Sequence, residues 1–219
     1  RWDAFDIPDL SGYMDATDGV EGTITASGDG FAKEHFTNAF DNGVSKWCIK
    51  TPTIWVQYSF PEEMKPRIAA YSIMSANDAP RRDPKNWTLL GSNDGESWDI
   101  VDNREHQAFL GRHFLRLFEI AKPAEYRHYK LDVTLNHGGE ESQLAEIQLL
   151  VPRPKDAQLS DKEIDGLFAL ARDESGYTPM FAADLANATL KPGSWVLSSD
   201  GVLDAKGGGD IWTRKQYAD

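Results

Sequence analysis

The sequence is poor in cysteine and has no long apolar run. Its 219 residues include one cysteine, Cys48, so a disulfide within the chain is excluded. Because Cys48 lies between Trp47 and Ile49, we expect it to be a small buried apolar residue, and the sequence indicates neither a zinc site nor a thiol nucleophile. No run approaches the roughly 18 consecutive apolar residues that a membrane-spanning helix needs. We therefore expect no insertion into a membrane.

Basic residues are outnumbered by acidic ones. The chain has 23 Lys and Arg against 35 Asp and Glu, which gives a formal net charge of −12 at pH 7. The phosphates of nucleic acids and anionic membranes would repel such a chain, so neither is an expected partner. The charge is typical of an extracellular module. The start at Arg1, without an initiator Met or a signal-like apolar segment, indicates a chain cut from a longer precursor.

Short runs of alternating apolar and polar residues fill most of the chain before Val151. The run IWVQYSF, for example, has the alternation of a half-buried strand. The expected strands are Thr23–Ala26, Ile54–Phe60, Ile68–Ser75, Trp87–Ser92, Trp98–Asp102, Arg112–Ile120, Tyr126–Leu135 and Leu144–Val151. Turn signals separate them and no helical period precedes Ser160, so the pattern predicts an all-β antiparallel sandwich or jelly roll. The tryptophans within or beside these runs are expected to lie in its core: Trp47, Trp55, Trp87 and Trp98.

The stretch from Ser75 to Trp98 organises the rest of the chain. In it a proline-containing polar loop joins two predicted strands, and an Asn-Asp-Gly turn at 93–95 closes the second strand. Loops held on a rigid scaffold are where binding residues concentrate. This loop carries the polar residues Asn77, Asp78, Arg81, Arg82 and Asp83. Alternatively, Asp78 and Asp83 pair with Arg81 and Arg82 and only make the loop rigid.

The pattern changes after Val151. Two prolines prevent ladder pairing here, and residues 153–159 are expected to be a linker. A capping box at Ser160–Glu163 predicts a helix over Asp161–Arg172, and short β signals follow at 194–197, 202–204 and 210–213. So few strands do not bury a sandwich core. Residues 160–219 are therefore expected to form a short helix and a partial second β-sandwich, which would gain a core by packing on the first domain or on another chain.

Five separated motifs stand out along residues 14–152: Ala39–Trp47, Ile54–Phe60, Ser75–Trp98, Tyr126–Thr134 and Gln143–Leu150. In their order and spacing they resemble the factor V/VIII type C, or discoidin, family, which includes carbohydrate-binding module family 32. The resemblance covers residues 14–152 and leaves 1–13 as a lead-in. It implies a galactose-binding-like jelly roll. Bacterial members commonly bind sugars within secreted glycan-degrading enzymes, whereas animal members more often bind lipid or protein.

By this resemblance a glycan binds loops at one end of the sandwich. Sugar recognition needs planar donors and acceptors for the hydroxyl groups, and an apolar surface for the C–H face of the ring. The candidate ligand-binding residues are His35, Phe36, Asn77, Asp78, Arg81, Asn136 and His137.

The resemblance also implies a structural calcium ion that ties the two ends of the domain together. The candidate ligands are Asn38, Asp41, Gly43, Ser45 and Glu146. Two carboxylates, a hydroxyl and loop carbonyls suit a hard cation that takes about six to eight oxygen ligands. The alternative is that Asp41 only caps its own turn while Glu146 pairs with a cationic side chain.

A second resemblance covers Tyr177–Asp219 and relates it to the opening of the bacterial 3-keto-disaccharide hydrolase family. The pattern W-x-L-x-x-x-G-V-L over Trp195–Leu203 carries it, together with the glycines at 207–209 and the pair Trp212-Thr213. The sequence departs from that family at 182–184, where Ala-Ala-Asp replaces the usual Asn-Gly-Lys. No catalytic residue is carried over.

Together these observations predict a carbohydrate-binding module of a secreted bacterial glycan-degrading protein, located outside the cell, in the periplasm or at the cell surface. One alternative is an enzyme that acts on glycosides or 3-keto-glycosides through its C-terminal domain. The other is a discoidin module that binds protein or lipid. That alternative needs exposed apolar side chains at the loop tips, whereas the long loop is polar.

Overall fold

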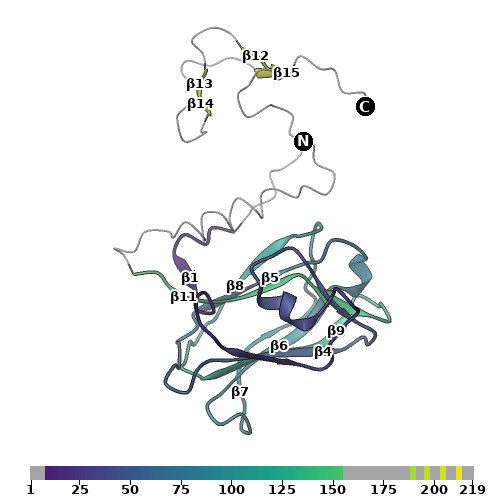
Figure 1. Cartoon of the computed structure of the whole chain (residues 1–219), viewed down its shortest axis with the longest axis vertical. Coiled ribbons are helices and arrows are strands. Elements are labelled where there is room, and N and C mark those ends of the chain that lie inside the picture. Colours follow the sequence, from purple (N-terminus) through teal and green to yellow (C-terminus); the bar gives the residue numbers. More distant parts are fainter. Residues whose placement is uncertain (1–7, 155–187, 191–194, 198–202, 206–210, 214–219) are drawn as a thin grey trace. The chain divides into compact units, whose positions relative to one another are not determined.

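The computed structural model describes residues 8–154 and four short strands nearer the C-terminus, at 188–190, 195–197, 203–205 and 211–213 (Figure 1). The chain divides into two compact units, Arg1–Ala171 and Arg172–Asp219. Among the described residues, no helix is long and apolar enough to span a bilayer.

The first unit is a sandwich of two antiparallel sheets (Figure 1). A four-stranded sheet has the order β1 (Tyr13–Asp15), β11 (Glu146–Pro152), β5 (Ala70–Met74) and β8 (Leu115–Glu119). A five-stranded sheet has the order β2 (Thr23–Ala26), β4 (Ile54–Ser59), β9 (His128–Asn136), β6 (Pro84–Ser92) and β7 (Asp99–Arg104). A small pair, β3 (Trp47–Ile49) with β10 (Ser142–Leu144), accompanies them. The predicted all-β sandwich is thus confirmed.

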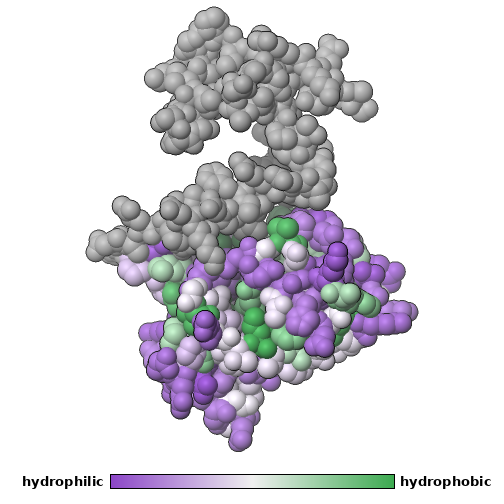
Figure 2. Space-filling model, in the orientation of Figure 1, coloured by the Kyte–Doolittle hydropathy of each residue, from purple (hydrophilic) through white to green (hydrophobic). Residues whose placement is uncertain are grey.

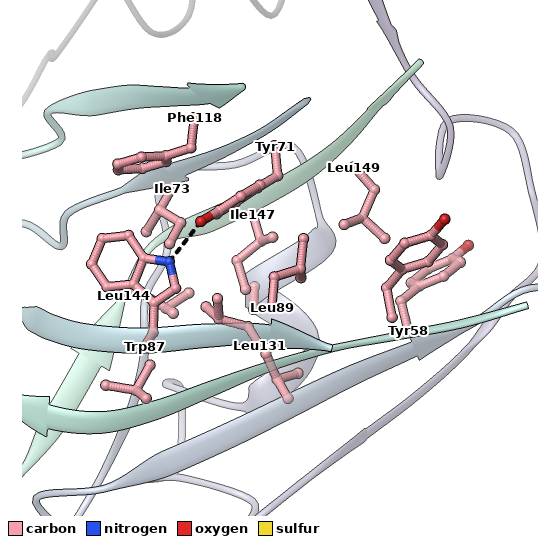
Figure 3. Close-up of a cluster of buried hydrophobic side chains, with 14 of the residues drawn as sticks. Tyr58, Tyr71, Ile73, Trp87, Leu89, Phe118, Leu131, Leu144, Ile147 and Leu149 are labelled. Carbon is pink, nitrogen blue, oxygen red and sulfur yellow. Dashed lines mark hydrogen bonds between the residues drawn. The ribbon is translucent and has the colours of Figure 1, made fainter. Parts of the chain in front are cut away.

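Alternation along the strands decides which side chains form the core. In β4, Ile54, Val56 and Tyr58 are buried, while Trp55 and Gln57 are not. The other strands of the five-stranded sheet contribute their inward residues in the same way, and the aliphatic and aromatic side chains of the two sheets meet in one cluster (Figure 3).

All eight strands expected from the sequence are present, with ends that shift by at most three residues, and Thr23–Ala26 is matched at both ends. The strands that the sequence did not indicate in this unit are β1, β3 and β10, of three residues each. Two short 3-10 helices, η1 (Phe36–Phe40) and η2 (Pro80–Arg82), were also unexpected. Segments this short are below the length at which periodicity is informative.

The expectation that four tryptophans are core residues is half right. Trp47 and Trp87 are buried, but Trp55 and Trp98 are partly exposed. Trp55 lies on the outward row of β4, and Lys130 of the neighbouring β9 places its Nζ 5.9 Å from the Trp55 ring centroid and 3.9 Å from that of Trp98. The strand alternation therefore outweighed hydrophobicity, and the cation–π contacts stabilise the exposed rings.

Cys48 is buried, as expected, in β3. Burial, together with the charge of Glu34, raises the pKa of its thiol to about 11. The thiol is therefore protonated at neutral pH, which agrees with a packing role.

A chain of polar groups crosses the core between the two sheets. The indole Nε1 of Trp87 in β6 donates to the hydroxyl of Tyr71 in β5 at 2.8 Å (Figure 3). That hydroxyl donates to Asp102 Oδ2 in β7 at 2.7 Å, and Arg104 Nε donates to the same oxygen at 2.6 Å. Each buried polar group thereby has a partner, and one hydroxyl connects the four-stranded sheet to the five-stranded sheet.

The second unit contains two strand pairs in its described parts. β12 (Ala188–Leu190) pairs with β15 (Ile211–Thr213), and β13 (Trp195–Leu197) pairs with β14 (Leu203–Ala205), both antiparallel. The β signals at 194–197, 202–204 and 210–213 therefore predicted real strands, and β12 was missed. The expected helix 161–172 and residues 155–159 of the expected linker lie outside the described residues.

We predict that Tyr71→Phe lowers the free energy of unfolding by about 1 to 3 kcal/mol, because it leaves the buried Trp87 N–H without an acceptor. Urea unfolding followed by tryptophan fluorescence measures this. The matched control is Tyr126→Phe, whose hydroxyl donates to Asp99 at 2.9 Å in an exposed place, and we expect it to change stability by less than about 0.5 kcal/mol. Equal effects of the two variants would contradict a special role for the Tyr71 hydroxyl.

Candidate functional site

The strand registers gather several loops at one end of the sandwich. β9 ends at Asn136, opposite Pro84 at the start of β6, and Arg104 at the end of β7 pairs with Trp87. β5 ends at Met74, opposite Leu115 at the start of β8. The loops 75–83, 105–114 and 137–141 therefore lie at the same end, where β2 also ends and leads into residues 27–35. We call this set of loops the loop end.

A buried lysine joins two of these loops. The side chain of Lys46 is 8% exposed, and its Nζ lies 2.7 Å from Asp78 Oδ1 and 3.5 Å from Glu34 Oε1. Desolvation alone would raise the pKa of Asp78, but the hydrogen bond and the charge of Lys46 outweigh it and lower this pKa. Asp78, a predicted ligand residue, is therefore ionised and already holds a structural partner.

The sequence alternative proposed that the acidic residues of loop 75–83 pair with the arginines of the same loop. The structure shows other partners. Asp83 is buried and forms a two-pronged ion pair with Arg112, which also donates to the backbone oxygen of Asp78 at 2.8 Å. Arg82 pairs instead with Glu141. The partners of Asp83 and Arg82 therefore come from loops 105–114 and 137–141.

Arg81 is exposed and anchored at one nitrogen. Its Nη2 donates to the backbone oxygen of Gly138 at 2.9 Å, and the Gly139 N–H donates to the backbone oxygen of Arg81 at 2.9 Å. A Cβ on Gly139 would lie 3.0 Å from that same oxygen, so the close approach of the two loops requires glycine there. The neighbouring predicted residue Asn77 is also exposed. Both side chains are thus presented to solvent on a fixed backbone.

The predicted pair Asn136 and His137 is used differently. Asn136 is buried, and its Nδ2 donates to the backbone oxygens of Gly139 at 3.0 Å and Glu141 at 2.8 Å. Its amide therefore shapes its own loop. His137 is partly exposed and its Nε2 donates to the backbone oxygen of Gln107 at 2.9 Å, which joins loops 137–141 and 105–114.

His35 and Phe36 lie at the start of η1. His35 is its N-cap residue, with Nδ1 3.0 Å from Thr37 Oγ1, and its ring is 4.2 Å from that of Phe36 between centroids. Phe36 packs against the core while His35 is exposed. This pair offers a polar edge beside an aromatic ring.

Two apolar side chains at the loop end were missed by the sequence analysis. Phe31 is 44% exposed and Leu110 in loop 105–114 is 77% exposed. The face of the described residues that Figure 2 shows is mostly hydrophilic, with small apolar patches. Only position in the fold distinguishes these two residues from core residues, so the sequence carried no signal for them.

One of the predicted calcium ligands, Glu146, is a buried carboxylate with Asp41 and Gly43 nearby. Glu146 is 3% exposed and neither of its carboxylate oxygens has a hydrogen-bond partner, nor does Asp15 Oδ2. Burial, and the charges of Asp41 and Asp15, raise the pKa of Glu146 well above its usual range. Burial raises the pKa of Asp15 to about 6. Asp15 was missed because it lies at the edge of the acidic lead-in, where no motif singled it out.

The other predicted ligands form a tight turn beside Glu146. Asp41 Oδ1 accepts from the Gly43 N–H at 2.7 Å, as the turn-capping alternative requires. Asn38 Nδ2 donates to the backbone oxygens of Lys33 at 3.0 Å and Lys46 at 2.9 Å, and Ser45 is exposed. The alternative pairing of Glu146 with a cationic side chain is absent from the described residues.

Within the described part of the chain, no three His, Cys, Asp or Glu side chains converge closely enough to hold a metal ion unaided. The orphaned oxygens of the buried Glu146 are nevertheless the kind of ligand that a hard cation takes, provided that backbone carbonyls, water or the nearby Asp41 complete its coordination.

The sandwich has the fold of factor V/VIII type C and family 32 carbohydrate-binding domains. A family 32 module from C. perfringens NanJ, solved in complex with galactose, matches with a TM-score of 0.50 at 12% identity, over 59% of this chain and 93% of that one. An F5/8 type C domain from Bacteroides fragilis matches with a TM-score of 0.50 at 14% identity, over 67% of this chain and 96% of that one.

Among curated proteins, the chain is similar to peptide-N(4)-(N-acetyl-beta-glucosaminyl)asparagine amidase from Arabidopsis thaliana. The two are 39% identical over 107 residues, which are 47% of this chain and 15% of the amidase. The chain thus spans a small part of that enzyme. No family model matches the chain. These comparisons give no support to the 3-keto-disaccharide hydrolase resemblance of residues 177–219, which stays a prediction.

We predict that, without divalent cations, Glu146→Gln stabilises the protein at pH 7.5 by about 3 °C in melting temperature, the shift that roughly 1 kcal/mol produces in a domain of this size. A carboxyl group whose pKa is raised in the folded state binds more protons there than when unfolded, so stability falls as pH rises through the raised pKa. Because the pKa of Glu146 is raised in this way, the gain from Glu146→Gln should shrink toward pH 5. Asp15 adds a similar dependence in both proteins, between its usual pKa of 3.8 and about 6.

Calorimetry with a chelator at each pH makes this comparison. Burial also lowers the pKa of His128, whose titration acts in the opposite sense, so the variant and the parent chain are compared at equal pH. A variant less stable than the parent at pH 7.5 would show that the ionised Glu146 is satisfied by the nearby amides of Asn42 and Gly43.

Proposed function

We propose that residues 8–154 bind glycans through the loop end, as one module of a larger glycan-active protein. The observation that carries this proposal is the set of cross-loop contacts that hold the backbone around Arg81 and Asn77 while leaving both side chains exposed. A guanidinium and a carboxamide are planar groups that match pairs of sugar hydroxyls. Because the loops are already held in place, little conformational entropy is lost on binding.

The remaining candidates divide into two roles. His137 and the His35–Phe36 pair add a polar edge and an aromatic ring to the same end. Asp78 and Asn136 are occupied by Lys46 and by their own loop, so in this proposal they position the binding residues.

The comparisons with known proteins also support the proposal of glycan binding. The NanJ module of the same fold was solved with galactose, and the Arabidopsis relative is an amidase of the linkage between N-acetylglucosamine and asparagine. Since the chain covers 15% of that amidase, we propose that the parent protein acts on glycans outside this module. A secreted bacterial glycoside hydrolase is the parent we favour from the sequence.

A second candidate function is binding to another protein. The exposed Phe31 and Leu110 favour it, because apolar side chains at loop tips are the feature that a protein-binding discoidin module needs. Loop 75–83 itself remains polar.

We further propose that a structural calcium ion binds at Glu146 and Asp41, two of the ligands predicted from the sequence, with loop carbonyls or water completing its coordination and Asp15 nearby. Support comes from the orphaned oxygens of Glu146 and Asp15. Asp15 lies in β1, Glu146 in β11, and these two strands pair. An ion there would neutralise buried charge and join the first strand of the domain to its last.

For glycan binding, we predict that Arg81→Ala weakens the best ligand of a glycan panel at least about tenfold, because a hydrogen bond to a charged group contributes about 1.5 to 3 kcal/mol. Asn77→Ala should also weaken it. Calorimetric titration of the whole chain measures both. Arg67→Ala is the control, because Arg67 is also bound to a backbone oxygen, that of Pro123, at the opposite end.

An unchanged affinity in Arg81→Ala would place the site elsewhere. If no glycan binds at all, protein binding becomes the leading function. Phe31→Asp would then test protein binding, because it removes an exposed apolar side chain without disturbing the core.

For the cation, we predict that millimolar calcium raises the melting temperature of the whole chain by several degrees at pH 7.5, because a ligand at 100 times its Kd stabilises the folded state by about 2.7 kcal/mol. The increase should be smaller at pH 5, where protonated carboxyl groups bind calcium poorly. Glu146→Gln and Asp41→Asn should lose the increase. An equal melting temperature with calcium and with chelator would overturn the calcium site and leave Asp41 as a turn cap.

A further inference from the structure

A hollow of about 450 Å³ lies beside loop 105–114, against β8. Its walls include His106, Gln107, Leu110, Phe114, Arg116 and Leu117. Its volume is in the range of small-molecule sites, about 300 to 1,000 Å³. Its exposed lining is more polar than apolar, with Leu110, Phe114 and Leu117 among its apolar residues. None of the residues predicted from the sequence to bind a ligand lines it.

The charged wall of this hollow is fixed in position. The guanidinium of Arg116 lies 4.9 Å from the ring centroid of Phe118 and 5.9 Å from that of Phe109. Its Nη1 donates to the backbone oxygen of Ala108 at 3.0 Å. The two rings and the one hydrogen bond hold the guanidinium plane, and its other N–H groups have no recorded acceptor among the described residues.

Arg116 also differs from the arginines around it. Arg82, Arg104 and Arg112 each form an ion pair with a carboxylate, whereas Arg116 has no carboxylate partner among residues 8–154. Partial burial, together with the charge of Arg104, lowers the pKa of Arg116. A half-buried cation without a counter-ion is unfavourable, and a bound anion would relieve it.

The backbone beside the hollow is strained. His106 and His113, near the two ends of loop 105–114, have φ angles of 55° and 49°, in the left-handed region that residues other than glycine rarely adopt. Such strain concentrates at binding sites, where the surrounding structure holds it in place. His106 itself lines the hollow.

We propose that this hollow binds the carboxylate-bearing ring of an acidic sugar, a uronic acid, with the carboxylate on Arg116. The planar guanidinium matches a carboxylate with two parallel hydrogen bonds. Leu110, Phe114 and Leu117 contact the C–H face of the ring, and Gln107 is placed to meet its hydroxyl groups. The inference rests on the proposed glycan-binding function and adds a second subsite to it.

The hollow belongs to the loop end, because loop 105–114 forms much of its lining. Gln107 lines the hollow, and its backbone oxygen accepts the hydrogen bond from His137. Loop 137–141 thus contacts both the loop that lines the hollow and Arg81. The net negative charge of the chain makes a local cation of this kind the feature that would select an acidic ring over a neutral one.

The test is an NMR titration of the whole 219-residue chain with D-glucuronate, D-glucose and acetate at equal sodium concentration. We expect saturable shifts in residues 106–117 with glucuronate, and at least about tenfold weaker effects with glucose, which lacks the charge, and with acetate, which lacks the ring. Equal effects of acetate would reduce the site to simple anion binding. Equal effects of glucose would remove the role of the charge. Either result overturns the proposal.

Two variants locate the site. Arg116→Gln should abolish the preference for glucuronate over glucose, and Arg67→Gln at the other end of the sandwich should not change it. Arg116 packs on two rings, so Arg116→Gln can also lower stability. A second variant, Leu110→Asp, therefore places a charge that repels the carboxylate at an exposed position. Ile100→Asp, at another exposed apolar position on β7, is the control. Unchanged glucuronate binding in Leu110→Asp would overturn the proposal even if Arg116→Gln unfolds.

Arg81→Ala separates this inference from the proposed function. If Arg81→Ala loses neutral glycans while glucuronate still shifts residues 106–117, the two subsites are distinct and both are supported. If neutral glycans bind at Arg81 but glucuronate leaves 106–117 unchanged, only the acidic subsite is overturned.

Discussion

The hydroxyl group of Tyr71 is the constraint on which the sandwich depends. It accepts from Trp87 and donates to Asp102, so one oxygen on the four-stranded sheet satisfies two groups of the five-stranded sheet. Phe118 completes the arrangement by stacking on Tyr71 and meeting Trp87 edge-on. Hydrophobic burial brings the two sheets together without direction, whereas this polar chain fixes their relative position. The relative position of the two sheets in turn sets the geometry of the loop end.

At the loop end, most charged residues serve to hold loops and few remain for ligands. Lys46, Arg82 and Arg112 each join segments that are distant in sequence, through Asp78, Glu141 and Asp83. A rigid set of loops is the condition for recognising a sugar, whose hydroxyls differ between isomers only in direction. Within residues 8–154, Arg81 on one side and Arg116 on the other are among the cations that have no carboxylate partner.

Unlike the carboxylates in these ion pairs, those of Asp15 and Glu146 have no cationic partner among the described residues. Their raised pKa values mean that their ionised forms destabilise the fold in the absence of a cation. Asp94, in the β6–β7 turn, shows the contrast: backbone amides of Ser97 and Glu96 lower its pKa to about 2. A carboxylate that caps a turn is satisfied by its own donors. Neither oxygen of Glu146 makes a hydrogen bond, and the nearby amides of Asn42 and Gly43 do not offset the rise in its pKa, which is why the cation proposal rests on Glu146.

The sequence by itself determined the fold class and eight of the strands of the first unit, because alternation with a period of two needs only local information. It also determined which loop would carry Asn77 and Arg81. Tertiary structure alone decided which charges meet: Asp83 pairs with Arg112 from a distant loop, and Trp55 faces outward over Lys130. It also decided that Asp15 approaches Glu146 and that Arg116 lines a hollow. Contacts of this kind depend on how strands far apart in the chain align, and no local pattern encodes that alignment.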